Sequence, residues 1–204
     1  DGTVKTFSGG GSDITGSIVA KACRASMYEN WTDVSGCLVA DPRVIDNPQP
    51  IKVVTYRELR ELSYMGASVL HEEAIFPVRT AGIPINIRNT NAPDEPGSLI
   101  MESFPDDEND KQFVTGITGK RGFTIVTVTK SGMSSEVGFL RKVLEVFEKY
   151  NVSIEYVPSG IDSVSVVVSE KSVRDCLYAI LGDLQKTAKP DGINIIENIA
   201  IVAV

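Results

Sequence analysis

The sequence contains little histidine, cysteine and tryptophan, and it has no long apolar run. Among its 204 residues are one histidine, one tryptophan and three cysteines. The cysteines (Cys23, Cys37 and Cys176) are scattered and lack CxxC spacing, so they indicate reduced thiols in a cytosolic protein. No apolar run approaches the length of a transmembrane helix, and the first residues have no signal-peptide pattern, so no membrane partner is expected.

Basic residues are also outnumbered, with 20 lysines and arginines against 27 aspartates and glutamates. The net charge of −7 argues against a nucleic-acid or anionic-membrane surface. A site for an anionic ligand would therefore use backbone amides, a few local basic residues or a metal ion. The hydrophobic content of 42% is enough to build one large core or two small ones.

The first half of the chain alternates strand and helix patterns, which is typical of a parallel α/β sheet. Strands are expected at residues 28–32, 83–87 and 98–101, and helices at residues 14–25, 55–65 and 69–80. Thr55 and Glu58 have the spacing of a capping box. Ser12 and Asp13 are predicted to cap the first helix, whose sheet-facing residues would be Ile14, Ile18, Val19 and Ala22.

The acidic, proline-broken segment at residues 105–112 predicts a linker between a first domain, residues 1–104, and a second, residues 113–204. The second domain has the element order βαββαβ, which predicts a ferredoxin-like α+β unit. Its first helix would expose a Glu145–Lys149 pair, and Ser172 and Asp175 would cap its second helix. A strand is expected at residues 193–196, and another would begin at Ala200.

Three consecutive glycines lie near the start of the chain, in the segment Phe7-Ser8-Gly9-Gly10-Gly11-Ser12-Asp13. An apolar run precedes them and a helical pattern follows, so open backbone amides and a helix dipole would be available to an anion. A glycine run after a strand also occurs as a plain tight turn, and the pattern alone leaves both interpretations open.

Three ordered motifs and the start of the second domain resemble the aspartate kinases. Residues 8–13 resemble the Gly-Arg-Gly-Gly-Ser-Asp segment of that family. Thr32-Asp33-Val34 with Gly36, followed by Ala40-Asp41-Pro42-Arg43, resembles its nucleotide-binding signature. Residues 66–71 resemble its Gly-Ala-Lys-Val-Leu-His motif, and residues 131–140 with the helix after them resemble its first regulatory ACT domain.

The resemblance implies the C-terminal half of the amino acid kinase fold followed by an ACT domain. It implies a kinase that phosphorylates the β-carboxylate of L-aspartate with MgATP, on the route to lysine, threonine and methionine, under feedback inhibition. The family's Lys-Phe-Gly-Gly segment does not occur in the 204 residues, and a second ACT domain would follow Val204. The chain alone is therefore expected to be inactive.

The resemblance also assigns site residues. Substrate aspartate would contact Gly10, Gly11, Ser12 and Asp13, with Asp13 as the catalytic, site-ordering residue. ATP would contact Thr32, Asp33, Leu38, Asp41, Arg43, Ser68 and Val69. The guanidinium fork of Arg43 suits a phosphate. Gly9 and Ser68 stand where the family has an arginine and a lysine. No metal-ligating residue is predicted, and His71 is interpreted as a helix-start residue rather than a base.

In the second domain the resemblance implies a site for an effector amino acid, at the interface of a homodimer formed through the ACT domains. The effector residues would be Met133, Ser135, Glu136, Gly138, Phe139, Leu140, Glu155 and Asp162. Their carboxylates could receive amino groups, which favours lysine over threonine. Three alternatives stay open: a plain surface loop, a stand-alone ACT-type regulatory protein without kinase activity, and another amino-acid-kinase relative such as a glutamate or uridylate kinase.

Overall fold

The computed structural model describes residues 11–64, 70, 72–104 and 114–204. The chain divides into two compact units, one of residues 1–119 with residues 202–204, the other of residues 120–201. The predicted linker at residues 105–112 lies outside the described residues.

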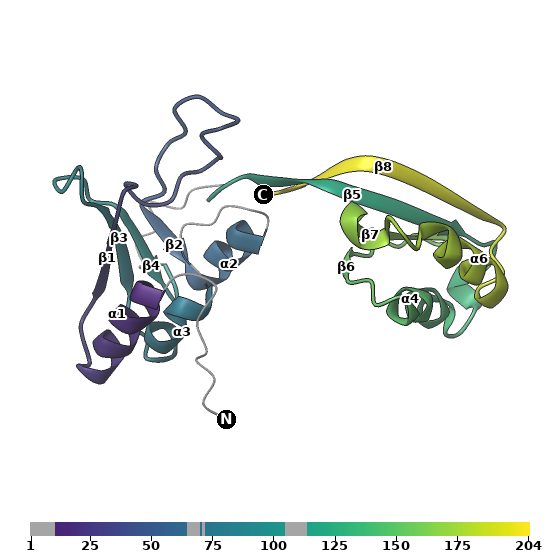
Figure 1. Cartoon of the computed structure of the whole chain (residues 1–204), viewed down its shortest axis with the longest axis horizontal. Helices are drawn as coiled ribbons and strands as arrows, with labels where there is room; N and C mark the ends of the chain where they lie inside the picture. The colour runs from purple at the N-terminus through teal and green to yellow at the C-terminus, as the bar shows by residue number, and fades with distance from the viewer. Residues whose placement is uncertain (1–10, 65–69, 71, 105–113) are drawn as a thin grey trace. The chain divides into compact units, whose positions relative to one another are not determined.

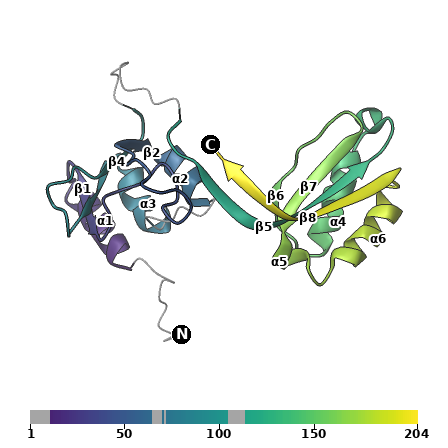
Figure 2. The ribbon, with the colours of Figure 1, turned by 90° about the horizontal axis from the view of Figure 1, so that it is seen from above.

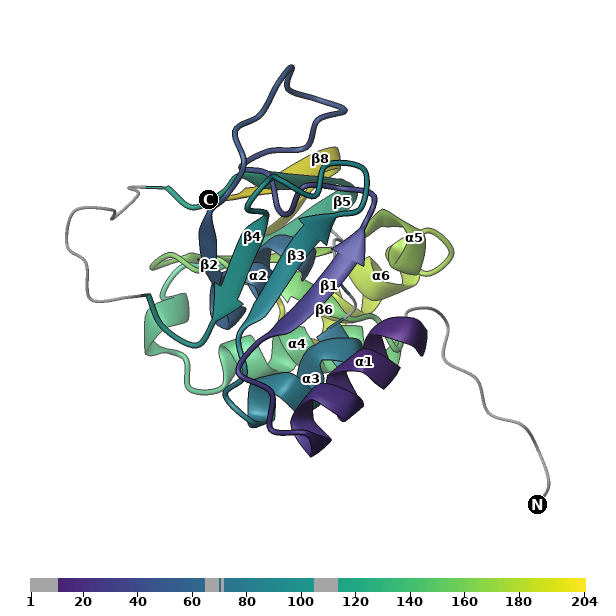
Figure 3. The same ribbon diagram turned by 90° about the vertical axis from the view of Figure 1, so that its left-hand side faces the viewer.

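The first unit is built on a four-stranded sheet (Figure 3). Its order is β1 (Tyr28–Thr32), β3 (Ile85–Asn89), β4 (Ser98–Met101) and β2 (Val53–Thr55). The pairs β1–β3 and β2–β4 are parallel, as expected, whereas β3–β4 is antiparallel. Only residues 90–97 join β3 to β4. A parallel crossover needs a dozen or more residues, so this short link enforces the antiparallel pairing.

Among the described residues, three helices accompany this sheet: α1 (Gly11–Ala22), α2 (Tyr56–Tyr64) and α3 (Glu72–Thr80). The predicted capping box at α2 is confirmed, because Glu58 N–H donates to Thr55 Oγ1 at 3.2 Å and Thr55 N–H donates to Glu58 Oε2 at 2.9 Å. After α3 the chain turns at Gly82, whose φ is +66°. There Ile83 N–H donates to the carbonyl of Val78 at 3.0 Å, as in a glycine-terminated helix.

The expectations for α1 are wrong in two respects. The helix begins at Gly11, so Ser12 and Asp13 lie in its first turn rather than ahead of it, and it ends at Ala22. Its buried residues are Ser17 and Ala20, while Ile18 and Val19 are each 53% exposed. Small residues allow α1 to approach α3, where Ser17 Oγ accepts the N–H of Val78. Apolar spacing selects the large side chains and misses a contact made by small ones.

The core of the first unit is made by the faces of the strands that alternation predicts. Ile85, Ile87 and Ile100 have no exposed surface, and Ile85 lies opposite Ile100 in the β3–β4 register. Val54 from β2 and Val78 from α3 belong to the same fully buried group, as does Ile51. The sheet and its helices therefore form a rigid support for the loops at the strand ends.

The second unit is an antiparallel sheet with helices on one face (Figures 1 and 2). The strand order is β6 (Ile154–Tyr156), β7 (Ser163–Ser169), β5 (Thr118–Thr129) and β8 (Gly192–Ala203). The helices are α4 (Phe139–Lys149) and α6 (Leu177–Thr187). The short 3-10 helix η2 (Met133–Ser135) precedes α4, and the short helix α5 (Glu170–Val173) precedes α6. With β5 as the first strand, the spatial order is 2-3-1-4, so the predicted ferredoxin-like βαββαβ unit is confirmed.

Four local expectations for the second unit are wrong. Glu145 pairs with Arg141 at 2.7 Å rather than with Lys149, which pairs with Asp183 on α6. Neither Ser172 nor Asp175 caps α6, whose N-cap is Cys176 and has no side-chain cap bond. Ser172 Oγ instead donates to the carbonyl of Ser169. The two strands expected at the end of the chain form a single strand, β8, because its partner β5 is equally long at 12 residues.

No helix within the described ranges combines the length and the apolarity that crossing a bilayer requires.

Replacement of Gly36 should destabilise the first unit. A Cβ at Gly36 would lie 2.3 Å from Ser98 Oγ, and the residue has φ +97°. We expect Gly36→Ala to lower the unfolding free energy by about 3 kcal/mol, from left-handed strain together with overpacking. The matched control Gly82→Ala has φ +66° but nothing within 4 Å of its Cβ, and should cost about 1 kcal/mol.

The measurement is urea unfolding followed by the fluorescence of Trp31, the single tryptophan, which lies in the first unit. Equal losses in the two variants would contradict the close approach of Ser98 to Gly36.

Candidate functional site

Edge strand β1 brings Asp13 into contact with polar residues that sequence reasoning missed. Asn30 Nδ2 donates to Asp13 Oδ1 at 3.1 Å and lies 3.2 Å from the hydroxyl of Tyr28. The Tyr28 hydroxyl in turn donates to the carbonyl of Asp13 at 3.3 Å. Asn30 is only 8% exposed. The carboxylate in the first turn of α1 is therefore fixed by a buried asparagine on the neighbouring strand.

The nucleotide-signature residues begin where β1 ends. Thr32 is the last residue of the strand, and its hydroxyl donates to the exposed Asp33 carboxylate at 3.2 Å. The carbonyl of Thr32 accepts both the N–H and the hydroxyl of Thr90, at 2.8 and 2.9 Å. Because side chains alternate along a strand, Asn30 and Thr32 lie on the same face, roughly 7 Å apart along β1.

The next part of the signature is tied to the sheet by a buried serine. Ser98 Oγ, on β4, accepts the N–H of Cys37 at 2.8 Å and donates to the carbonyl of Ile51. Ile51 N–H donates back to the carbonyl of Cys37 at 2.8 Å. Leu38 forms an antiparallel bridge with Pro50. Residues 37–38 are therefore held against the chain that leads into β2.

Arg43 and Asp41 bind each other within the loop that follows. The guanidinium donates to both carboxylate oxygens, with Nη2 2.7 Å from Oδ2 and Nε 3.0 Å from Oδ1, and Asp41 Oδ1 also accepts the backbone N–H of Arg43. These hydrogen bonds from Arg43 lower the pKa of the Asp41 carboxyl. The Arg43 side chain is 81% exposed, so the pair stands in solvent with its fork already occupied by a carboxylate.

Not every predicted residue of the first unit can be placed. Gly10, Ser68 and Val69, together with Gly9 and His71, lie outside the described residues. Gly11 and Ser12 are exposed at the start of α1. The missed residues had one available signal: within the predicted strand Tyr28–Thr32, alternation places the polar Asn30 at an inward position, where a polar side chain requires a partner.

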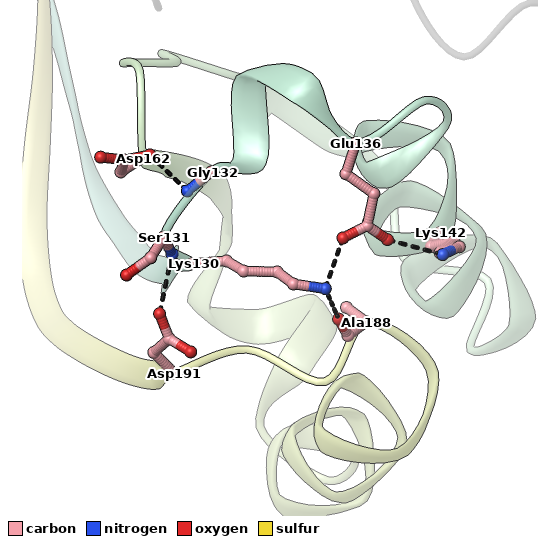
Figure 4. Close-up of polar contacts among 8 residues, drawn as sticks. All are labelled: Lys130, Ser131, Gly132, Glu136, Lys142, Asp162, Ala188 and Asp191. Atoms are coloured by element: carbon pink, nitrogen blue, oxygen red, sulfur yellow. Dashed lines mark hydrogen bonds and ion pairs between the residues drawn. The ribbon is translucent and has the colours of Figure 1, made fainter.

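In the second unit, an ion-pair network organises the predicted effector loop (Figure 4). Glu136 is bound by two ammonium groups, Lys142 Nζ at 2.7 Å and Lys130 Nζ on its other oxygen. Lys130 also donates to the carbonyl of Ala188 at 3.3 Å, and its ammonium lies 5.3 Å from the ring centre of Phe139. The hydrogen bonds from Lys130 and Lys142 lower the pKa of the Glu136 carboxyl. Both of its oxygens are already engaged.

Two aspartates hold the start of the same loop. Asp162 Oδ1 accepts the N–H of Gly132 at 2.9 Å, and Asp191 Oδ2 accepts the N–H of Ser131 at 2.7 Å (Figure 4). The bond from Ser131 lowers the pKa of the Asp191 carboxyl. These carboxylates flank an open pocket of about 440 Å³ that is also lined by Thr129 and Ser163.

The other predicted effector residues are distributed around α4 and β6. Gly138 is the N-cap of α4 with φ +79°, and Phe139 is 2% exposed. Leu140 lines a groove of about 1030 Å³ that is also lined by Ser153 and Ile154. Glu155 lies at a register shift of β6, between Ile154 and Tyr156. Such bulges redirect side chains and are frequent beside binding sites. Met133 packs on the core and Ser135 closes η2.

The chain is similar in sequence and in structure to amino acid kinases. Residues 2–89 match the model of the Amino acid kinase family. Aspartokinase 3 of Bacillus subtilis is 43% identical over 170 residues, which are 83% of this chain and 37% of the relative. The crystal structure of Clostridium acetobutylicum aspartate kinase, described as an allosteric enzyme, matches with a TM-score of 0.85 and 52% identity over 98% of this chain and 46% of that one.

Escherichia coli aspartokinase III matches in two states. Its complex with lysine and aspartate gives a TM-score of 0.70 at 27% identity, covering 97% of this chain and 43% of that one. Its complex with aspartate and ADP gives 0.68 at 26% identity, covering 95% and 43%. The chain therefore belongs to the aspartate kinase family, as the resemblance implied, and spans less than half the length of these relatives.

The contact between Asn30 and Tyr28 should be visible in the titration of Tyr28. Burial raises the pKa of the Tyr28 hydroxyl, the hydrogen bond from Asn30 lowers it, and the charge of Asp13 raises it, with a net rise. An N–H donor stabilises the phenolate, so Asn30→Ala should move the pKa of Tyr28 further upward.

The measurement is tyrosinate absorbance against pH, with the titration of Tyr28→Phe subtracted to isolate this hydroxyl. Asn89→Ala, which removes an asparagine on β3 that binds Ser35 instead, should leave the Tyr28 titration where it is. A fall in the pKa of Tyr28 in the Asn30 variant would contradict the assigned contact.

Proposed function

We propose that the chain forms one side of the active site of an aspartate kinase together with a regulatory domain that controls it. In this proposal the parent enzyme transfers the γ-phosphoryl group of MgATP to the β-carboxylate of L-aspartate. The main support is strand β1, where Asn30, which binds Asp13, and Thr32, which begins the nucleotide signature, share one face. A partner of the substrate residue Asp13 and a nucleotide-signature residue, two positions apart on one strand, favour a kinase over a stand-alone regulatory protein.

Asp13 would order the substrate end of the site, with Gly10, Gly11 and Ser12 beside it. Phosphoryl transfer depends on positioning and charge neutralisation, and a carboxylate acceptor has no proton for a base to remove. Asn30 would act by holding the Asp13 carboxylate in one orientation. The solved complexes of E. coli aspartokinase III with aspartate support this choice of substrate.

The nucleotide would lie against Thr32, Asp33, Leu38, Asp41 and Arg43. Ser68 and Val69, which lie outside the described residues, would also contact it. The site fits one wall of a nucleotide pocket, since a hydroxyl, an exposed carboxylate and an exposed guanidinium lie at and beyond the end of β1. Arg43 would exchange the Asp41 carboxylate for a phosphate, which matches its fork equally well.

Magnesium would arrive coordinated by the nucleotide phosphates. Over the part of the chain that the structure describes, His, Cys, Asp and Glu side chains do not gather in groups of three that could hold a metal ion. The ADP complex of E. coli aspartokinase III supports an adenine nucleotide as the ligand.

The second unit would bind an effector amino acid, with lysine as the expected ligand. The N-terminus of α4, around Phe139 and Leu140, would receive its carboxylate, because the helix dipole favours an anion there, although Phe139 N–H already donates to the carbonyl of Glu136 at 3.3 Å. The ammonium groups of the ligand are assigned to the carboxylates of Glu155 and Asp162, while Glu136 stays bound to Lys130 and Lys142. The lysine complex of E. coli aspartokinase III supports this effector. A homodimer through the short edge strand β6 would enclose the ligand.

Calorimetry should detect L-lysine binding to the 204-residue chain and much weaker binding of L-threonine. We expect Glu155→Gln to weaken lysine binding by about tenfold, since a charged hydrogen-bond partner is lost. Glu197→Gln on β8, a carboxylate outside the proposed site, serves as the control and should bind lysine normally. Equal heats from Glu155→Gln and the unaltered chain would contradict the role of Glu155.

The 204-residue chain alone should form no aspartyl phosphate from ATP and aspartate, as trapped with hydroxylamine. Two cations that the family places near its substrates are replaced by Gly9 and Ser68, and the Lys-Phe-Gly-Gly segment does not occur in the sequence. The loss of each charged contact costs about 1.5–3 kcal/mol. Aspartyl hydroxamate formed by the purified chain would contradict this expectation.

A further inference from the structure

Three consecutive residues ahead of β5 dock onto the first unit beside the nucleotide signature. Thr115 Oγ1 donates to Glu58 Oε1 at 2.6 Å. Gly116 is buried so closely that an added Cβ would lie 3.1 Å from Leu62 Cδ2. Ile117 N–H donates to the carbonyl of Val39 at 2.6 Å. All of these residues belong to the unit formed by residues 1–119, and a side chain, a close approach and a backbone bond fix the segment in register.

Val39 is the point at which the nucleotide signature receives this support. Its N–H donates to the carbonyl of Gln49 at 2.9 Å, while its carbonyl accepts the N–H of Ile117 at 2.6 Å. Beyond Val39 the hydrogen bonds are local, because Arg43 and the N–H groups of Val44 and Ile45 all bind Asp41. The contact with Ile117 thus lies within residues 38–43, the stretch proposed to hold ATP.

The two carboxylate oxygens of Glu58 accept hydrogen bonds from different residues. Oε2 accepts the N–H and the hydroxyl of Thr55 and caps α2, whereas Oε1 accepts Thr115. Burial raises the pKa of this carboxyl, but the bonds from Thr115 and Thr55 outweigh it and leave the pKa below its usual value. Glu58 is therefore ionised at neutral pH, and Thr115 can be released without loss of the helix cap.

The docked segment and the proposed effector loop lie at opposite ends of one strand. β5 starts at Thr118, directly after Ile117, and ends at Thr129, directly before Lys130. Its last seven residues pair continuously with β7, from Phe123 opposite Ser169 to Thr129 opposite Ser163. Lys130 then anchors the loop through Glu136. A displacement of the loop would therefore act on β5, whose first residue follows Ile117, the residue bonded to Val39.

We infer that residues 115–117 are a positioning element for the nucleotide segment at residues 38–43, with Thr115 and Glu58 as its positioning residues. Through this element the effector site would act on nucleotide binding. The second statement rests on the proposed function, since it needs an effector at the loop that follows β5. The first rests only on the contacts of the first unit.

Hydrogen exchange of the full 204-residue chain, followed by mass spectrometry, tests both statements. Thr115→Val keeps the shape of the side chain and removes the bond to Glu58. We expect exchange at residues 38–43 to become about tenfold faster in this variant, since a charge-assisted hydrogen bond is lost. Thr115→Ser retains the hydroxyl and should restore slow exchange. The control Thr127→Val removes the 2.8 Å bond to Ser165 inside the second unit and should leave residues 38–43 unchanged.

The same experiment with millimolar L-lysine tests the coupling. We expect protection at residues 131–140 in the unaltered chain and in Thr115→Val, with a change at residues 38–43 in the unaltered chain alone. Unchanged exchange at residues 38–43 in Thr115→Val overturns the positioning role. Protection of the loop without any response at residues 38–43 in the unaltered chain overturns the coupling. Failure of both lysine and threonine to protect the loop overturns the proposed effector site, while the ligand-free comparison still decides the positioning role.

Discussion

The first unit depends on one buried hydroxyl. Ser98 has no exposed surface, and its Oγ links the N–H of Cys37 to the carbonyl of Ile51. Hydrogen bonds to this one atom therefore connect β4, the segment that leads into β2, and the nucleotide signature. A buried polar group is stabilising only when its hydrogen bonds are complete, and losing this hydroxyl would remove a hydrogen-bond partner from both the Cys37 N–H and the Ile51 carbonyl in the core. Gly36 is required beside it because any Cβ there would lie only 2.3 Å from this hydroxyl oxygen. The course of the signature follows from this close approach.

The sequence was sufficient to predict the architecture because the strongest signals are local. Isoleucine alternation at Ile85 and Ile87, the Thr55–Glu58 capping box and the amphipathic pattern of α4 each depend on residues close together in the chain. Some of the wrong local predictions concern side chains whose contacts are made with residues far away in the sequence. Lys149 pairs with Asp183 across two helices, and Ser17 packs on α3 through a contact that no spacing rule identifies.

The candidate site was predictable in outline for a similar reason. Motifs placed Thr32 and Asp33 at a strand end, and the structure puts them there. The motifs did not reveal that Asn30 holds Asp13, that Arg43 is already paired with Asp41, or that two lysines share Glu136. In each case several charged or polar groups could have bound the same partner. Which of them does so depends on distances in the folded chain, and the sequence does not give those distances.

The lysine–glutamate network in the second unit has a consequence for the thermodynamics of association. Lys130 is fixed at once by Glu136, the Ala188 carbonyl and the Phe139 ring, and Asp162 and Asp191 hold the adjacent amides. A loop that orders only when a ligand arrives loses about 0.5–1.5 kcal/mol for each side chain that becomes immobile. Here that entropy is already lost when the domain folds. A small ligand meeting this preorganised loop would retain most of its contact energy as affinity, and its heat of binding would carry little contribution from refolding.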